Sequence, residues 1–282
     1  MKVAVIGAGI VGLSTANWLK RYGQDVTLFD REDPGSQASF GNAGTYAKYA
    51  NIPTNSSSFF YLFPYLLLNK NSPLFFKRGK FIQSLPWLMQ YLSNCRQSKV
   101  RDTSNKLTTL LSLVDEGYED LFNDADIENL ISRESIFYVW SNKLFYNSAR
   151  KDFETREKTG VKIEIISKNE INDVEPNINN IFYKGALFKG SYFAKNPKKI
   201  SEKLLQLFIE KGGNFKKEKI DEIKILDTNK VNIHTNENTY TYDRIVLCAG
   251  VWSKKLTDKL GENIPLASER GYHLMYPHPE NL

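Results

Sequence analysis

The sequence contains few of the residues that build thiol, metal or charge-relay sites. Among 282 residues there are only two cysteines, Cys95 and Cys248, and three histidines. The cysteines have no CxxC spacing and no neighbouring histidine ligand, so neither a disulfide framework nor a metal site is expected, and a reducing compartment is favoured. No Ser/His/Asp pattern indicates a hydrolase either.

Long hydrophobic runs are also absent. The apolar run Val3–Ile6 is too short for the core of a signal peptide. A later apolar stretch, Phe59–Leu68, contains Pro64 and falls well short of the roughly 20 residues that a spanning helix needs. We therefore expect a cytoplasmic protein. Basic residues at 77, 78 and 80 leave open a peripheral contact with the inner face of the cell membrane.

The overall charge does not indicate a nucleic-acid-binding protein. The formal net charge is +6, but many lysines alternate with acidic residues and no basic cluster on one face can be recognised. With 41% hydrophobic and 25% charged residues, the chain has a globular composition. Its length suits one large domain or two closely packed ones.

A glycine-rich turn near the N-terminus carries the clearest chemical signal. Gly7-Ala8-Gly9-Ile10-Val11-Gly12 matches GxGxxG, follows a predicted buried strand and opens a predicted helix. The first glycine permits the tight turn, the second lets the backbone approach a pyrophosphate, and the third lets helix and strand pack closely. Asp30, at the end of the next predicted strand, would accept hydrogen bonds from ribose hydroxyls. The unit is predicted to bind the ADP half of a dinucleotide.

Three features favour FAD over NAD as that dinucleotide. The motif lies at the extreme N-terminus, and a long loop of small residues follows Asp30 as far as Gly44. Such a loop could run along a diphosphate toward a flavin ring. A late buried strand ends in Cys248-Ala249-Gly250, as though the sheet begun at residue 3 were rejoined after a long insertion. An NAD-dependent dehydrogenase is the weaker alternative.

These residues resemble the FAD-dependent amino-acid oxidoreductases of the D-amino-acid oxidase superfamily, and within it bacterial D-amino-acid dehydrogenases. The resemblance covers most of the chain. The stretches that carry it are Val5–Gly12, Phe29–Glu32, Ser39–Gly44, Pro86–Leu88, Asn94–Cys95, Glu175–Pro176 and Arg270–Leu274.

The resemblance implies a role for individual residues. The glycine turn would bind the FAD diphosphate, Asp30 the adenosine ribose, and the backbone of Ile220 the adenine. Tyr272 would lie where the substrate-domain sheet approaches the flavin and is the candidate catalytic residue on the substrate side, although simple packing in that sheet is an equal alternative. The implied cofactor contacts are Ile6, Gly7, Ala8, Gly9, Ile10, Val11, Gly12, Asp30, Arg31, Ser39, Asn42, Ala43, Gly44, Ile220, Ala249 and Gly250.

The implied fold is α/β. It combines a Rossmann-like FAD-binding domain of the glutathione-reductase type with an interleaved α+β substrate domain on a mostly antiparallel sheet. Residues 1–50 and 196–255 would form the FAD-binding domain. Residues 51–195 would form a mainly helical segment and the substrate domain, to which residues 256–282 would return. The closing part of the family, which includes an arginine that pairs with the substrate carboxylate, is expected to be absent after Leu282.

The implied activity is oxidation of the Cα–N bond of an amino acid, most readily a D-amino acid. Hydride transfer to flavin N5 would leave an imine that water converts to a 2-oxo acid and ammonia. The electron acceptor is left open between oxygen, a quinone and a protein. Two alternatives remain at this point: a glycine- or sarcosine-type amine oxidase, and a catalytically incompetent FAD-binding fragment.

Overall fold

A computed structural model describes residues 1–55, 63, 65 and 81–274, so the expected packed segment Phe59–Leu68 lies almost wholly outside the described residues. The chain forms two compact units. Unit 1 consists of Met1–Gly44, Tyr118–Ser132 and Ala194–Leu282, and unit 2 of Thr45–Gly117 and Arg133–Phe193. The domain boundaries inferred from the sequence stay a prediction.

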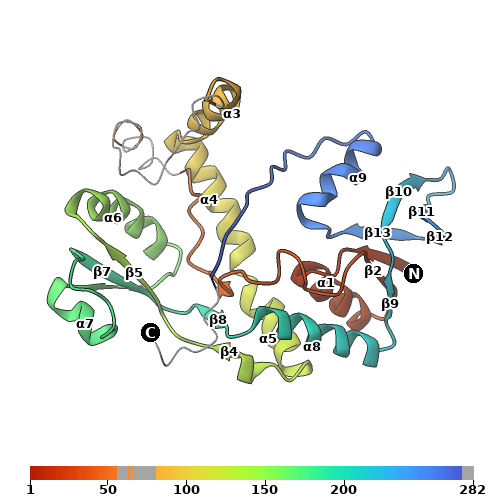
Figure 1. Ribbon diagram of the computed structural model, residues 1–282, viewed down its shortest axis with the longest axis horizontal. Coiled ribbons are helices and arrows are strands. Elements are labelled where there is room, and N and C mark those ends of the chain that lie inside the picture. The colour runs from red at the N-terminus through yellow and green to blue at the C-terminus, as the bar shows by residue number, and fades with distance from the viewer. Residues whose placement is uncertain (56–62, 64, 66–80, 275–282) are drawn as a thin grey trace. The chain divides into compact units, whose positions relative to one another are not determined.

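A parallel four-stranded sheet is the centre of unit 1 (Figure 1). Its order is β13 (Arg244–Leu247), β1 (Lys2–Ile6), β2 (Asp25–Asp30) and β9 (Asn214–Lys217). The late strand β13 pairs with β1 in parallel, with Val246 opposite Val5. The sheet begun at the N-terminus is therefore completed by a strand more than two hundred residues later, as the sequence predicted.

Two helices of unit 1 pack against each other beside this sheet. In α1 (Ile10–Arg21), the buried Asn17 donates from Nδ2 to the Leu204 carbonyl of α8 (Pro197–Glu210) at 2.9 Å. The side chain of Asn196 caps α8 by accepting from the Lys199 N–H, and Pro197 occupies the first turn, where its missing N–H costs nothing. Gly23 follows the end of α1 with φ of 73°, which suits a glycine.

A second, antiparallel sheet packs against the first. It consists of β10 (Ile220–Ile225), β11 (Val231–Thr235) and β12 (Thr239–Tyr242). Phe29 from β2 packs within 6.0 Å of the rings of Tyr240 and Tyr242, in a core that also contains Ile233 and Leu256. The remaining elements of unit 1 are η2 (Glu128–Leu130), β4 (Ile131–Ser132), η4 (Gly250–Trp252) and α9 (Ser253–Lys259).

Unit 2 is built on antiparallel strands. Its main sheet has the order β5 (Ile136–Trp140), β7 (Lys184–Phe188), β6 (Ile163–Ile166), and β3 (Thr45–Tyr46) pairs with β8 (Tyr192–Ala194). An aromatic core that includes Tyr146, Phe153 and Phe188 lies beneath α6. The helices are α3 (Phe81–Asn94), α4 (Gln97–Leu111), α5 (Val114–Asp124, which continues into unit 1), α6 (Lys143–Glu157), η3 (Lys168–Glu170) and α7 (Ile171–Val174). The expected α/β class, with parallel and antiparallel sheets, is confirmed.

No helix among the described residues has both the length and the apolar character needed to cross a membrane.

Candidate nucleotide site

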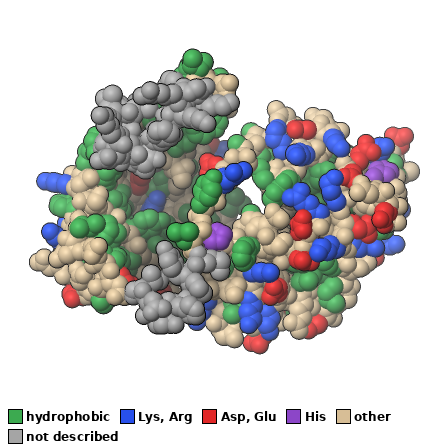
Figure 2. All heavy atoms as spheres, in the orientation of Figure 1, with side chains coloured by type: hydrophobic (Ala, Val, Ile, Leu, Met, Phe, Trp, Pro, Cys, Tyr) green, Lys and Arg blue, Asp and Glu red, His purple; other side chains and the backbone are tan. Residues whose placement is uncertain are grey.

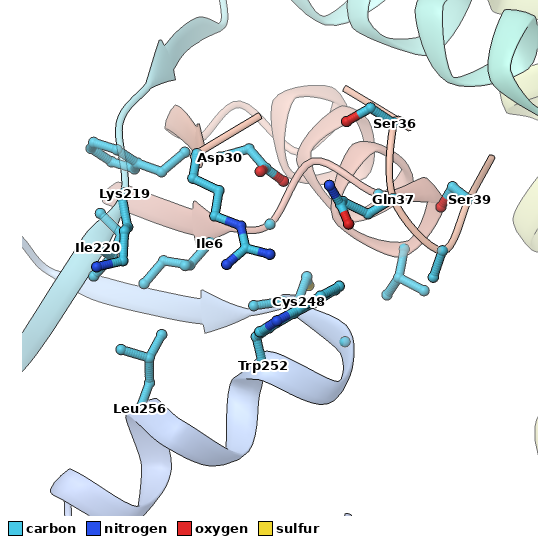
Figure 3. A pocket seen from close by; sticks show the side chains of 18 of the residues that line it. Ile6, Asp30, Ser36, Gln37, Ser39, Lys219, Ile220, Cys248, Trp252 and Leu256 are labelled. Carbon is cyan, nitrogen blue, oxygen red and sulfur yellow. The ribbon is translucent and has the colours of Figure 1, made fainter. Parts of the chain in front are cut away.

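Unit 1 contains a cavity of about 510 Å³ at the carboxyl ends of its parallel strands (Figure 3). Parallel α/β sheets place their ligands at this edge because helix N-termini and loop residues converge there. Four segments supply the walls: the turn after β1, the end of β2 with the loop that follows it, the start of β10, and the turn from β13 into α9. Figure 3 shows Asp30 and Ile6 on one side of the cavity and Trp252 and Leu256 on the other.

The glycine turn is shaped by close backbone contacts. Gly7 has φ of 109° and donates its N–H to the Phe29 carbonyl at 2.7 Å. A Cβ at Gly7 would overlap the carbonyl of Cys248, which directly follows the neighbouring strand β13, and a Cβ at Gly12 would overlap the Gly7 carbonyl oxygen. Only glycine fits at these two positions, so the turn leaves backbone where a side chain would otherwise stand.

Gly9 begins the wall of the cavity at the N-terminus of α1. This helix has no acidic residue in its first turn, and its N-cap Gly9 offers no side chain. Instead, Ser39 from the loop after β2 accepts from the Ile10 N–H through Oγ at 2.9 Å. The positive end of the helix dipole therefore faces the cavity with Gly9, Ile10 and Val11 on its wall, an arrangement suited to a phosphate group.

Asp30 is held in a defined orientation at the end of β2. Its Oδ2 accepts from the Ala8 N–H at 2.6 Å, and its Oδ1 accepts from the Glu32 N–H at 3.0 Å. Each carboxylate oxygen has a second lone pair, so both retain the capacity to accept from a ribose hydroxyl. The carboxylate thus ties the glycine turn to β2 and remains part of the cavity wall.

An arginine and a tryptophan meet across the cavity. The Arg31 guanidinium carbon lies 4.7 Å from the centre of the Trp252 ring, and both residues line the cavity. Ile220 and Leu256 extend this wall with apolar surface, which suits the faces of a purine base. The sequence patterns did not identify Trp252, although an aromatic residue in the turn that follows a strand ending at the binding edge was the available signal.

Two exposed ion pairs lie at the rim of the cavity. Lys217 Nζ lies 2.7 Å from Asp33, and hydrogen bonding to that lysine lowers the pKa of the Asp33 carboxyl. Lys219 pairs with Asp221 at 2.6 Å. Cys248 also lines the cavity, and burial raises the pKa of its thiol, so this cysteine is a neutral wall residue at physiological pH.

Twelve of the residues predicted from the sequence line the cavity, and five do not. Ala8 and Gly12 belong to the turn itself, where the Ala8 N–H donates to Asp30 and Gly12 abuts the Gly7 carbonyl, and Ala43 and Gly44 lie farther along the loop. In that loop Asn42 accepts from the Gly44 N–H at 2.7 Å. Tyr272 has 87% of its surface exposed and does not line the cavity, so its catalytic role stays a prediction. The twelve are Ile6, Gly7, Gly9, Ile10, Val11, Asp30, Arg31, Ser39, Asn42, Ile220, Ala249 and Gly250.

These residues fit the ADP half of FAD. A backbone cradle that side chains would fill faces a helix N-terminus, a fixed carboxylate is available to accept from ribose hydroxyls, and an apolar wall with an aromatic ring is available for adenine. Together with the parallel sheet, this arrangement defines a dinucleotide-binding protein.

The family follows from comparison with known proteins. Residues 2–282 match the model of the DAO family, described as FAD dependent oxidoreductase, so the chain belongs to that family. FAD is the cofactor of this family, which confirms at the family level the choice of FAD over NAD.

Individual relatives differ in their substrates. A D-amino-acid oxidase of Bradyrhizobium diazoefficiens is 28% identical over 281 residues, which are 99% of this chain and 66% of the relative. Glycine oxidase from Geobacillus kaustophilus has a TM-score of 0.64 at 16% identity, with 92% of this chain and 58% of that chain covered. L-amino acid deaminase from Proteus vulgaris, in a form with its specific insertion sequence deleted, has a TM-score of 0.65 at 15% identity, with 93% of this chain and 56% of that chain covered. The last two likenesses show the fold alone, and the chain spans slightly less than two thirds of the curated relative.

Proposed function

We propose that this protein is an FAD-dependent oxidoreductase that converts an amino acid, preferentially a D-amino acid, to a 2-oxo acid and ammonia. The observation that carries the proposal is the cavity formed by the glycine turn and Asp30 in a chain that matches the DAO family from residue 2 to residue 282. The D-amino-acid oxidase relative supports the choice of substrate.

The residues of unit 1 bind and orient the cofactor. When bound, FAD supplies a two-electron acceptor for the hydride from the substrate Cα, and water then hydrolyses the released imine. Gly7 and Gly9 let the backbone approach the diphosphate, and the α1 N-terminus stabilises its charge. Asp30 accepts from the ribose hydroxyls while its contacts with Ala8 and Glu32 keep it in place. Trp252 and Ile220 provide surface for the adenine.

Anaerobic spectroscopy tests the activity. The purified protein is loaded with FAD, desalted, and its visible spectrum is recorded before and after addition of D-alanine, L-alanine, glycine or sarcosine. Bleaching by D-alanine, with release of ammonia and pyruvate, is the expected result. Bleaching only by glycine and sarcosine, or only by L-alanine, would reject the proposed substrate. A yellow protein that no substrate bleaches binds FAD without turnover, and a colourless protein contradicts the proposal.

Two aspartates of the same strand provide a matched test of the site. Asp30 and Asp25 lie at opposite ends of β2, and only Asp30 lines the cavity. We expect Asp30→Ala to lower FAD retention after desalting at least tenfold, because the ribose contact and the support of the turn are both lost. Asp25→Ala should retain FAD like the unmodified protein. Equal retention by the two variants would contradict the role of Asp30.

A further inference from the structure

The loop after β2 has an exposed tip that lies between two residues of the cavity wall. On one side of the tip, Ser39 accepts from the Ile10 N–H at the start of α1, and on the other side Asn42 lines the cavity. The tip itself consists of Phe40 and Gly41, and the Phe40 side chain is 42% exposed. Neither tip residue lines the cavity. A shift of the tip would nevertheless move both wall residues, because they are its neighbours in the chain.

A histidine from a distant part of the chain packs on this tip. The stretch Arg270–Leu274 drew attention through Tyr272, but the residue that the structure brings to the loop is His273. A Cβ built at Gly41 would overlap the Cε1, Nε2 and Nδ1 atoms of the His273 ring. The rings of Phe40 and His273 meet edge to face, with their centres 6.0 Å apart and an angle of 82° between their planes. Loop and histidine both belong to unit 1.

Two separate reasons require a glycine at position 41. Its φ of 69° lies in the left-handed region, which glycine adopts without the steric cost that a side chain brings. The missing Cβ also leaves the space that the imidazole occupies. The same loop contains a second glycine with almost the same backbone, Gly35 with φ of 68°, but a Cβ there would meet Ser201 of α8. Gly35 therefore shares the backbone requirement of Gly41 and lacks its contact with His273.

The contact between His273 and the tip is one of packing and not of charge. Residues 34–44 contain no Asp, Glu, Lys or Arg. Acidic and basic side chains are interspersed over the visible face of unit 1 (Figure 2). The elements that carry the contact have charged groups of both signs, which are Lys198 and Glu202 on α8 and Glu269 and Arg270 beside the histidine. An uncharged aromatic ring should therefore be able to replace the imidazole.

We propose that His273 is a positioning residue of the nucleotide site. Its imidazole holds the tip of the loop, so that Ser39 stays bonded to the start of α1 and Asn42 stays on the wall of the cavity. An edge-to-face pair of rings is expected to change an equilibrium constant by about two- to tenfold. The proposal rests on the nucleotide site described above and does not depend on which amino acid is oxidised.

Titration of the apoprotein with ADP and with FAD tests the role of the ring. His273→Ala should weaken the binding of both ligands by about two- to tenfold, because part of the population no longer has the loop in its binding position. His273→Phe should bind both ligands like the unmodified protein, because it keeps an aromatic ring on the tip. Leu274→Ala is the matched control, since Leu274 is the next residue and is 82% exposed, and it should also bind like the unmodified protein.

A double-mutant cycle tests the contact itself. Gly41→Ala displaces the imidazole and also puts alanine into a left-handed conformation, whereas after His273→Ala only the second cost remains. Gly41→Ala should therefore weaken ADP binding more in the unmodified protein than in the His273→Ala protein. Gly35→Ala should have the same effect in both backgrounds, because its Cβ meets Ser201. If the glycine variants fold poorly, the His273 variants still decide the question, since that side chain is exposed.

Several results would overturn the proposal. They are unchanged ADP binding by His273→Ala, an equal loss in His273→Ala and His273→Phe, a loss of the same size in Leu274→Ala, and strictly additive effects of Gly41→Ala and His273→Ala. A His273→Ala protein that loses affinity for FAD but keeps its affinity for ADP would also contradict it, because the histidine would then act on the flavin part and not through the loop.

Discussion

At the scale of single residues, Gly12 and Gly117 form a matched pair. Both are glycines in helices, but a Cβ at Gly12 would overlap the Gly7 carbonyl, whereas one at Gly117 would meet nothing within 4 Å. Gly12→Ala should therefore destabilise the protein by about 2–3 kcal/mol through overpacking. Gly117→Ala should stabilise it by about 0.5–1 kcal/mol, because alanine favours helices. Urea unfolding measures both values, and two changes of the same sign would contradict the prediction.

Trp252 is the residue whose role in the nucleotide site is easiest to isolate. Arg31 stacks on Trp252 inside the cavity, and Arg21 stacks on Trp18 at 5.3 Å in a second pair that does not line it. Trp252→Ala should weaken FAD binding by about 1–2 kcal/mol, the usual worth of a partly buried stacking contact, whereas Trp252→Phe should lose less. Titration of apoprotein with FAD measures the change.

Trp18→Ala is the control for the loss of an arginine–tryptophan pair as such. It should bind FAD like the unmodified protein, because its pair lies outside the cavity. If Trp18→Ala and Trp252→Ala weaken FAD binding equally, the effect comes from general destabilisation and Trp252 has no specific part in the site.

At the scale of secondary-structure elements, local patterns in the sequence predicted most of unit 1. Short β-branched runs identified β1, β2 and β13, and the glycine turn identified the start of α1. The contact from Ser39 to the Ile10 N–H and the meeting of Arg31 with Trp252 could not be predicted. They join segments far apart in the chain, and no spacing rule relates such segments. Strand β12 was also missed, because Thr239–Tyr242 alternates polar and aromatic residues over only four positions.

Asp115 joins three elements of unit 2. It lies in the first turn of α5, forms an ion pair with Lys48 just after β3, and accepts from the Tyr192 hydroxyl of β8. Burial alone would raise the pKa of its carboxyl, but the hydrogen bonds with Lys48 and Tyr192 lower the pKa below the ordinary 3.8. A carboxyl with a lowered pKa stabilises the fold above its unfolded pKa, and that contribution is lost as the pH falls through the folded value.

Asp115→Asn should therefore lower the free energy of unfolding at neutral pH, and the deficit should shrink as the pH falls below about 4. Asp102→Asn is the control, because Asp102 forms an exposed i,i+4 pair with Lys106 and such pairs contribute little. Urea unfolding at a series of pH values measures the deficit. A deficit that is independent of pH would mean that the Asp115 charge does not stabilise unit 2.

At the scale of the whole molecule, the division into two units separates nucleotide binding from the rest of the fold. Every residue that lines the cavity belongs to unit 1. A ligand that binds only the folded state stabilises it by about 2.7 kcal/mol at a hundred times its dissociation constant. ADP carries the diphosphate, ribose and adenine of FAD but no flavin. Its binding therefore tests the cavity of unit 1 separately from any contacts with the flavin ring.

ADP should thus slow amide hydrogen exchange in the glycine turn from Gly7 to Gly12 and in the turn from Ala249 to Trp252. These segments form opposite walls of the cavity, and their opening is suppressed when the ligand holds both. Strands β5 and β7 of unit 2 should exchange at the same rate with and without ADP, because no residue of theirs lines the cavity. Asp30→Ala should abolish the protection and Asp25→Ala should preserve it. Protection confined to unit 2, or spread equally over both units, would show that ADP does not bind through the glycine turn.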